Sequence, residues 1–436
     1  MVVSLTIYLV LYILALFAIS FYVSRRQTTE DFLISGRNRG GWQILFSKFA
    51  AGIGAGYFIT YTGFAYEYGL GLFSMLLGLI AGYLVFAYWA SPRIFRNSKE
   101  GRFYTIGHFV FDRTKSKTAM YVADIFSSAI LFGWLLTGII GAGKIIDDFG
   151  LLSYNWAVII TSFVVLVYLL MAGHKAVILT DIVQSFVIFF LLIIITFSIV
   201  GSDNFGEILS FQGASVDIGV FIGFFLFGIL SVFSYSDRYQ LAYAAKNERN
   251  LRHGLGLAII PIAIAGFFLL LIGMFMASNS PGLDSGLIFT EALRNFLPAS
   301  LLPLAIVLFF AGVMSSADTN IYAISSHYAM HRKGEKISKV RAGTIWLTII
   351  TSIVAILFPN VVDVSILAGG ISLTLSFGMV YLIAGGRKAS RFVISSFFAL
   401  IAVIIGILIF GIEPILALPV LFAGAIGLLF RWKKLD

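Results

Sequence analysis

Apolar residues in this chain come in runs of about twenty, repeated from one end of the sequence to the other. A run of that length is what one helix needs to cross a bilayer. Charged residues make up 12% of the 436 residues and hydrophobic residues 59%, whereas a soluble domain carries about 25% charged residues. This composition excludes an ordinary globular enzyme and a disordered chain. We expect an all-α polytopic membrane protein.

We predict about thirteen transmembrane helices in a single transmembrane domain, residues 1–436. The first run lacks the positive start and the cleavage site of a signal peptide, so it counts as a span. The connection 279–299 could hold a short amphipathic helix around Leu287–Phe296 or be a plain solvated connector. The predicted spans are 3–24, 42–65, 70–92, 119–143, 156–173, 176–200, 218–237, 254–278, 300–328, 341–358, 362–385, 391–411 and 413–430.

Basic residues predict the orientation of these spans. Nearly all of the 30 Lys and Arg residues fall in alternate connections and at the C-terminus, while Lys144 and Arg294 lie on the other side and Lys48 lies within a span. Because basic loops stay in the cytoplasm, we expect the N-terminus outside and the C-terminus cytoplasmic, in a prokaryotic cytoplasmic membrane. This placement accounts for the net charge of +9 without nucleic acid, and the basic rim would contact anionic lipid.

Two of the predicted spans are interrupted at matching places. Span 42–65 contains Gly52, Gly54 and Gly56, followed by Tyr57, and alternate glycines weaken a helix. Span 218–237 contains Gly223 and Gly228 and turns polar at Ser234 and Tyr235. The two lie five spans apart, so the second copy of a five-span repeat would be inverted, and paired broken helices in inverted halves point to a transporter's binding site. Tight helix packing is the alternative role for the glycines.

Polar residues inside another span predict a cation site. Span 300–328 contains Ser315, Ser316, Asp318, Thr319 and Asn320, whose oxygens suit hard cations. The alternative is that these groups bond only within the protein.

Lys48, Asp181 and Asp318 are predicted to share one layer near the inner side. Their charges sum to −1, which one Na⁺ or H⁺ would neutralise. We expect the Lys48 nitrogen within about 4 Å of a carboxylate, an ion-pair distance, with Asp181 favoured over Asp318. The alternative has Lys48 extending to the inner surface. Asp124 is expected to be interfacial.

The chain has no cysteine, and no motif for an enzyme stands out. His327 and His331 are one helical turn apart and could share a metal, but no third ligand is evident, so interfacial histidines are favoured. We expect no catalytic site. No Arg is expected at the membrane centre, which makes a fixed clamp for a carboxylate unexpected. Aromatic walls from Tyr57, Trp134 and Tyr235 would suit apolar or ring-bearing solutes.

Four segments together resemble the solute:sodium symporter family, in the order expected for it. They are FLISGRNRGGW from residue 32, AGHKAVILTDIVQ from 172, DRYQLAYAAKNERNLRHG from 237 and AGVMSSADTN from 311. The resemblance implies the inverted five-plus-five LeuT-type fold of secondary transporters. The repeats would be 42–200 and 218–385, with one extra N-terminal helix at 3–24 and two extra C-terminal helices within 391–430.

The resemblance also implies a sodium site. Its ligands here would be the carbonyls of Ala50, Ile53 and Gly312 and the hydroxyls of Ser315 and Ser316. A second cation in some members would match Asp181, Asp318 and Thr319, but an acid at 318 and the added charge of Lys48 depart from the family pattern. The implied substrate-facing positions are Gly52, Gly54, Gly56 and Tyr57, and we add Trp134, Ser234 and Tyr235.

The sequence therefore predicts sodium-coupled symport of a small organic solute by alternating access. Na⁺ is the expected ion; no organic cofactor and no obligate protein partner are expected. One alternative is a proton-coupled or sodium-independent transporter of the same fold, in which Lys48 replaces a cation. An intramembrane enzyme, a channel or a sensor would be a different class of protein, and the motifs favour none of these.

Overall fold

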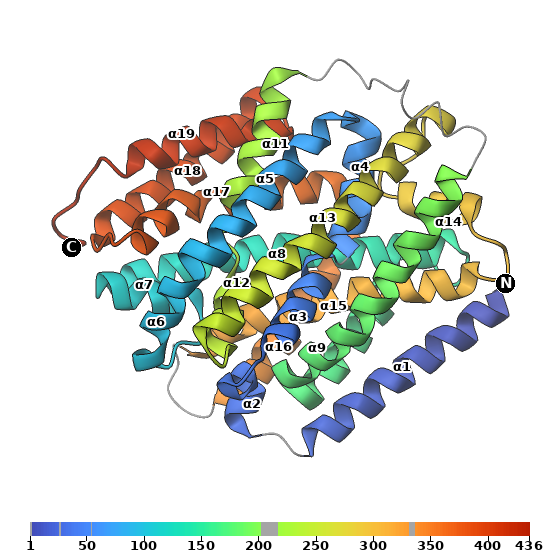
Figure 1. Cartoon of the computed structure of the whole chain (residues 1–436), viewed down its shortest axis with the longest axis horizontal. Coiled ribbons are helices and arrows are strands. Elements are labelled where there is room, and N and C mark those ends of the chain that lie inside the picture. Colours follow the sequence, from blue (N-terminus) through green and yellow to red (C-terminus); the bar gives the residue numbers. More distant parts are fainter. Residues whose placement is uncertain (1, 26–27, 54, 202–216, 331–335) are drawn as a thin grey trace.

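The computed structural model describes residues 2–25, 28–53, 55–201, 217–330 and 336–436, and within its helices most side chains, but not those of Gly56 or residues 172–184. Across this part of the chain the regular elements are helices, apart from one bridge between Arg39 and Ala245. Figure 1 shows a bundle of long, tilted helices with the N- and C-termini at opposite edges.

The helices of the first half are α1 (Val2–Ser24), α2 (Thr29–Ile34), α3 (Gly41–Gly52), α4 (Ala55–Tyr68), α5 (Gly71–Val85), α6 (Ser91–Gly101), α7 (Ile106–Thr114), α8 (Lys117–Asp148) and α9 (Tyr154–Val200), with short turns η1 (Ser35–Arg37) and η2 (Phe86–Ala90). Those of the second half are α11 (Ile218–Ser231), α12 (Ser236–Ala244), α13 (Glu248–Asn279), α14 (Ile288–Phe296), α15 (Leu302–Met330), α16 (Lys336–Leu357), α17 (Val361–Ile383), α18 (Ala389–Phe410), η3 (Pro414–Leu416) and α19 (Ala417–Gly427). Helix α14 confirms the short helix predicted in the connection 279–299.

Ten helices of the described chain are long and apolar enough to cross a membrane, and the bent pair α3–α4 makes up to eleven. The predicted count of thirteen is not confirmed by the described residues, for two reasons. The last predicted span, 413–430, is η3 followed by the short helix α19. The spans predicted at 156–173 and 176–200 both lie within the segment assigned to α9, of which, among the described residues, only Tyr154–Met171 counts as a candidate span. Tyr154 bonds to Ala355 at the end opposite the basic loops, Ser185 bonds to Phe46 near the basic loops, and Phe189 contacts Phe49 further from them. The chain therefore crosses the bundle and turns back within this segment.

The loops of the molecule meet at two ends, in the alternation that the charge pattern predicts. At one end Arg37 donates to the carbonyl of Phe103 at 2.9 Å, and Arg96 pairs with Glu248 at 3.3 Å. We call this the basic end. At the other end Lys144 pairs with Asp284 at 2.7 Å, and Arg294 pairs with Asp148 at 2.8 Å. The orientation of these ends in a membrane stays a prediction.

The first predicted interruption is confirmed and the second is shifted. Helix α3 ends at Gly52, and Ile53 has non-helical torsions (φ −111°, ψ 46°). Its axis lies at 52° to that of residues 57–68. Span 218–237 breaks at residues 232–235, between α11 and α12, and not at its glycines.

Gly223 and Gly228 lie inside the continuous helix α11, where they allow close packing. A Cβ at Gly228 would lie 2.5 Å from the carbonyl oxygen of Met75, and one at Gly78 would lie 2.3 Å from that of Phe225. Helices α5 and α11 therefore touch backbone to backbone, which only small residues permit. For these two glycines of α11 the packing alternative is the correct one.

Candidate functional site

The two broken helices border a cavity of about 130 Å³ in the middle of the bundle. Helices α5, α8, α13 and α15 complete its wall. The residues that line it are Lys48, Ala51, Gly52, Tyr57, Thr60, Tyr61, Met75, Leu79, Tyr83, Leu131, Trp134, Phe227, Ser231, Tyr235, Asp237, Arg238, Ile262, Ser316, Thr319 and Asn320. Broken helices bring free backbone ends to such a cavity, so the wall offers both polar backbone and side-chain groups.

Four of the predicted substrate-facing residues line this cavity: Gly52, Tyr57, Trp134 and Tyr235. The indole of Trp134 donates to the Tyr235 hydroxyl at 2.9 Å. The Tyr57 ring stacks on Tyr61 with centroids 4.7 Å apart. The aromatic character predicted for the wall is thus present.

The other three predicted substrate residues differ. Ser234 does not line the cavity: it is fully buried and its hydroxyl lies 3.0 Å from that of Ser376 on α17. The chain turns in the break, so Ser234 and Tyr235 face different neighbours. Gly54 lies outside the described residues, and of Gly56 only the helical backbone is described.

One part of the predicted sodium site meets the broken helix directly. The Ser316 hydroxyl donates to the carbonyl of Ala51 at 3.4 Å, next to the end of α3. Ser315 is fully buried beside it, and Gly312 lies one turn earlier on α15. Ala50 and Ile53 are also fully buried. Coordination by the carbonyls of Ala50, Ile53 and Gly312 stays a prediction.

Lys48 is buried and does not extend to the inner surface. Its residue is 2% exposed, and its ammonium lies 2.5 Å from a carboxylate oxygen of Asp237 on α12. A carboxylate partner was expected, with Asp181 favoured. The partner in the described structure is Asp237, which the sequence pattern places at the start of an inner loop, while the side chain of Asp181 lies outside the described residues. The short break before α12 brings Asp237 back to cavity depth.

The predicted second cation group is only partly described. Asp318 is fully buried and accepts a hydrogen bond from the Tyr168 hydroxyl at 2.6 Å. Thr319 donates to its other oxygen at 3.3 Å. The side chain of Asp181 lies outside the described residues. A second cation at Asp181, Asp318 and Thr319 stays a prediction.

Arg238 is a cavity residue that was not predicted from the sequence. It is 5% exposed and lines the cavity, contrary to the expectation that no Arg lies at the membrane centre. Its guanidinium lies over the rings of Tyr235 and Tyr83, 4.4 and 4.9 Å from their centroids, and donates to the Tyr83 hydroxyl at 2.8 Å. The sequence feature that could have identified Arg238 is the charged pair Asp237 and Arg238, which directly follows the polar break in this span.

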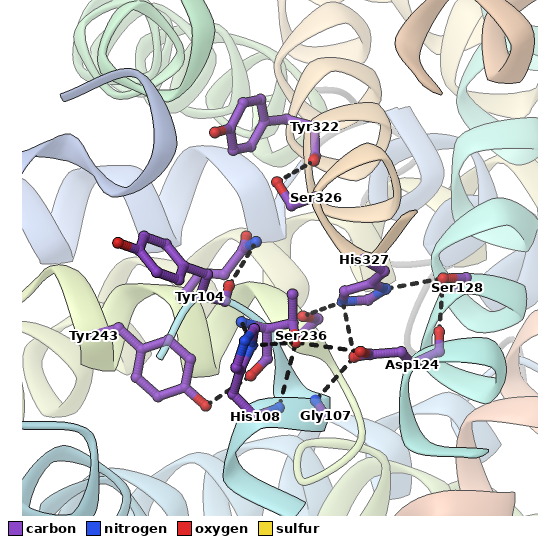
Figure 2. Close-up of polar contacts among 12 residues, drawn as sticks. Tyr104, Gly107, His108, Asp124, Ser128, Ser236, Tyr243, Tyr322, Ser326 and His327 are labelled. Carbon is purple, nitrogen blue, oxygen red and sulfur yellow. Dashed lines mark hydrogen bonds and ion pairs between the residues drawn. The ribbon is translucent and has the colours of Figure 1, made fainter. Parts of the chain in front are cut away.

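At the basic end, His327 and Asp124 form a buried polar cluster (Figure 2). His327 is 4% exposed, and its ring nitrogens lie 2.8 Å from the hydroxyls of Ser128 and Ser236. One of them lies 3.8 Å from Asp124, which also accepts from the amide of Gly107 at 2.8 Å. The cluster joins α7, α8, α12 and α15. His327 and Asp124 are thus buried in the protein at the basic end, and their interfacial depth in a membrane stays a prediction.

Metal catalysis finds no support in the described residues. No group of three His, Asp or Glu side chains there could hold a metal ion. His331, the second half of the histidine pair, lies outside them.

A larger cavity, which we call the vestibule, opens at the end opposite the basic one. Its volume is about 1180 Å³, and its charged lining residues are Glu67, Lys144, Asp284, Asp363 and Glu413. A smaller pocket lies between the two cavities, and its lining includes Trp134 of the central cavity and Ile366 of the vestibule. Burial raises the pKa of Asp284, but hydrogen bonds from Lys144 and from the Gly286 amide outweigh it and leave the pKa below its usual value.

Comparison with known families and proteins agrees with this geometry. The sodium:solute symporter family matches residues 32–354. The sodium/proline symporter 2 of Staphylococcus saprophyticus is 23% identical over 243 residues, which are 53% of this chain and 47% of that protein. The sodium/pantothenate symporter of Escherichia coli is 27% identical over 188 residues, which are 41% of this chain and 38% of that protein. The chain thus matches about half the length of these relatives or less.

Two solved structures share the fold. A sodium-coupled sialic acid symporter in a substrate-bound, outward-open state superposes with a TM-score of 0.76, at 19% identity and over 98% of each chain. Mhp1, a nucleobase-cation-symport-1 family transporter in a closed conformation, gives a TM-score of 0.62 at 11% identity over 92% of this chain and 94% of that one. The LeuT-type fold is therefore confirmed.

Proposed function

Because the chain belongs to the sodium:solute symporter family, we propose that it carries out sodium-coupled symport of a small organic solute by alternating access. The solute would bind in the central cavity, and sodium would bind where α15 meets the end of α3. The relatives from Staphylococcus saprophyticus and Escherichia coli are sodium symporters of bacteria. We propose a prokaryotic cytoplasmic membrane as the location, with the N-terminus outside and the basic end in the cytoplasm.

The observation that carries this proposal is the contact between Ser316 and the carbonyl of Ala51. The last carbonyls of a helix have no partner within it and form the negative end of its dipole. Since α3 ends inside the bundle, those carbonyls can serve as cation ligands together with a hydroxyl of α15. Hydroxyl and carbonyl oxygens are the ligands that hard cations prefer.

Sodium and solute would be coupled because one structural junction serves both. Gly52 and Ser316 line the solute cavity, and both belong to the junction of α3 and α15. A cation that binds there holds the cavity wall in place, and a solute in the cavity favours the same arrangement. Coupling of this kind is reciprocal by thermodynamic necessity.

The buried pair Lys48–Asp237 favours a second candidate, a proton-coupled or sodium-independent transporter of the same fold. A fixed ammonium in the cavity wall could replace one cation, so that the transporter would need at most one sodium per cycle. This candidate differs from the first in the ion that drives uptake.

The test measures the thermal stability of the purified protein and its uptake of solute in proteoliposomes, with and without sodium. We expect NaCl to raise the thermal unfolding midpoint above that in choline chloride, and a sodium gradient to drive uptake into proteoliposomes. Exchanging both Ser315 and Ser316 for Ala removes two ligands, and we expect the apparent sodium affinity to fall at least tenfold, about 1.4 kcal/mol.

The matched control is Ser326→Ala, on the same helix. Ser326 is about as buried as Ser315, and its hydroxyl bonds to the carbonyl of Tyr322 on its own helix at 2.9 Å. This variant should keep the sodium affinity of the unmodified protein. If the double Ser→Ala variant keeps it too, the sodium site is wrong; if only a proton gradient drives uptake, the second candidate replaces the first.

A further inference from the structure

The central cavity has a positive wall. Lys48 and Arg238 contribute two cations and Asp237 one carboxylate, and all three line the cavity. Lys48 lies 2.5 Å from Asp237, while the nearest distance between Arg238 and that carboxylate is 3.7 Å. Asp237 is thus bonded mainly to Lys48. Among the described residues of this wall, two cations face one carboxylate, and Arg238 is the cation with the longer contact to it.

Arg238 has donors to spare. A guanidinium carries five N–H groups, and this one donates to the Tyr83 hydroxyl through Nη2. Its Nε and Nη1 atoms are buried and have no hydrogen-bond acceptor in the described protein. A buried donor without an acceptor costs about 1–3 kcal/mol, and more when it is charged. An acceptor that arrives with the solute would remove this cost.

The guanidinium is also held in place before any solute arrives. The Tyr83 and Tyr235 rings lie 4.9 and 4.4 Å from it, and Tyr235 is fixed in turn by the Trp134 indole. Little side-chain freedom would be lost on binding, which improves affinity. A planar, pre-oriented guanidinium is the group that recognises a carboxylate best.

We propose that the transported solute is an organic carboxylate whose anionic group binds Arg238. This inference rests on the proposed function, since it names the chemical class of solute in the same cavity. A monoanion neutralises the remaining positive charge of the wall and supplies acceptors for the free N–H groups. Asp237 keeps Lys48 neutralised and would repel a second carboxylate, so one anionic group per solute is expected. The rest of the solute contacts the aromatic wall.

The experiment compares carboxylates with their uncharged analogues. Thermal unfolding midpoints are measured in NaCl with acetate, benzoate, proline, pantothenate and sialic acid, each against the matching amide, alcohol or ester. We expect at least one carboxylate to raise the midpoint by several degrees and its neutral analogue to raise it by less than a third as much. Arg238→Gln should remove at least nine-tenths of the apparent affinity for that carboxylate.

The matched control is Arg252→Gln, which removes the same charge from an exposed position at the basic end. It should bind the carboxylate as the unmodified protein does. Arg238→Lys keeps the positive charge but loses the planar, two-pronged donor arrangement of the guanidinium. This variant should bind the carboxylate weakly, which tests whether the donor geometry matters. The sodium-induced stabilisation of Arg238→Gln shows that this variant folds and that the sodium site is intact.

The outcomes separate the two proposals. If no carboxylate stabilises the unmodified protein more than its neutral analogue does, or if Arg238→Gln binds it equally well, the carboxylate proposal is overturned while sodium symport stands. If sodium stabilises neither the unmodified protein nor the variants, sodium symport fails, and carboxylate binding is still judged by the contrast between Arg238→Gln and Arg252→Gln.

Discussion

At the scale of single residues, the ion pair between Lys48 and Asp237 is the least ordinary feature of the cavity wall. Both side chains are buried, with 3% and 12% of their surface exposed. Removing ions from water costs several kcal/mol for each, and only close pairing offsets that cost. The pair joins α3 to α12, one half of each broken helix. The ion pair therefore fixes the position of α3 relative to α12 across the cavity.

Lys48→Met should destabilise the protein by about 3 kcal/mol, because it leaves the Asp237 carboxylate buried without its closest cation. The double variant Lys48→Met/Asp237→Asn should recover at least half of that loss, since no uncompensated charge remains. The measurement is the unfolding midpoint of detergent-purified protein. Lys115→Met breaks the exposed pair with Asp112 and serves as the control, with a change below about 0.5 kcal/mol. A double variant as unstable as the single one would contradict this account.

At the scale of elements, the glycines of this chain have two different roles that look alike in sequence. Gly52 ends α3 and borders the cavity. Gly228 sits within a helix and meets the backbone of α5. Both sit in spans that hold several glycines, so spacing alone could not separate them. The two roles differ because Gly52 borders a cavity and Gly228 contacts another helix, and the sequence alone does not show which neighbour a glycine has.

Gly228→Ala should lower stability by about 1–3 kcal/mol, the usual cost of forcing an extra methyl group into a packed contact. A Cβ at residue 228 would lie 2.5 Å from the carbonyl oxygen of Met75. Because that oxygen belongs to the backbone, a change of side-chain rotamer cannot relieve the clash. Gly138→Ala on α8 is the control, since its Cβ would have only the Val313 oxygen near it, at 4.0 Å. Unfolding midpoints of the two variants test the difference. Equal midpoints would show that α5 and α11 can move apart freely.

Much of the element order could be predicted because lipid and charge impose strong rules. Apolar run length predicted most of the spans, and the short helix α14 followed from its amphipathic pattern. Helix is assigned continuously across His174 and Lys175, where the sequence predicts a connection between two spans. The break of span 218–237 was placed at glycines although it begins at Val232, after Ser231, where no residue type marks it.

The site was predictable where glycine, polar or aromatic residues stand out within an apolar span. Gly52, Tyr57, Trp134 and Tyr235 were placed correctly at the cavity. Arg238 was not, because it was counted with the basic loop that it precedes. Four residues of non-helical chain at 232–235 are enough to return it to the cavity wall. Which neighbours a side chain meets after such a turn depends on tertiary packing.

At the scale of the whole molecule, the large vestibule lies at one end and a buried polar cluster lies at the other. A smaller pocket between the vestibule and the central cavity has lining residues in common with each. At the basic end, His327 joins α15 to α8 and α12 through Ser128 and Ser236 (Figure 2). If the basic end is cytoplasmic, as the charges predict, this is an outward-facing state. Alternating access then requires the His327 cluster to separate.

Weakening the hydrogen bonds of the His327 cluster should therefore raise the population of the state in which the basic end is open. His327→Gln replaces two good hydrogen bonds with weaker ones, and a loss of about 1.4 kcal/mol raises the population of the open basic end tenfold. The chain has no cysteine, so a single introduced cysteine reports its own exposure to a thiol reagent. Ser326→Cys is the probe at the basic end, since Ser326 is 1% exposed. Leu283→Cys is the probe in the vestibule.

We expect the labelling rate of Ser326→Cys to rise about tenfold when His327→Gln is added. That of Leu283→Cys should fall or stay level, because opening one end closes the other. Opposite changes at the two probes would distinguish a change of conformation from local unfolding. Local unfolding around His327 would speed labelling at residue 326 and lower the unfolding midpoint, but it would leave the labelling rate at residue 283 unchanged. A rate at residue 326 that does not change would mean that the cluster is not the seal, and that other contacts of α12 and α15 hold the basic end closed.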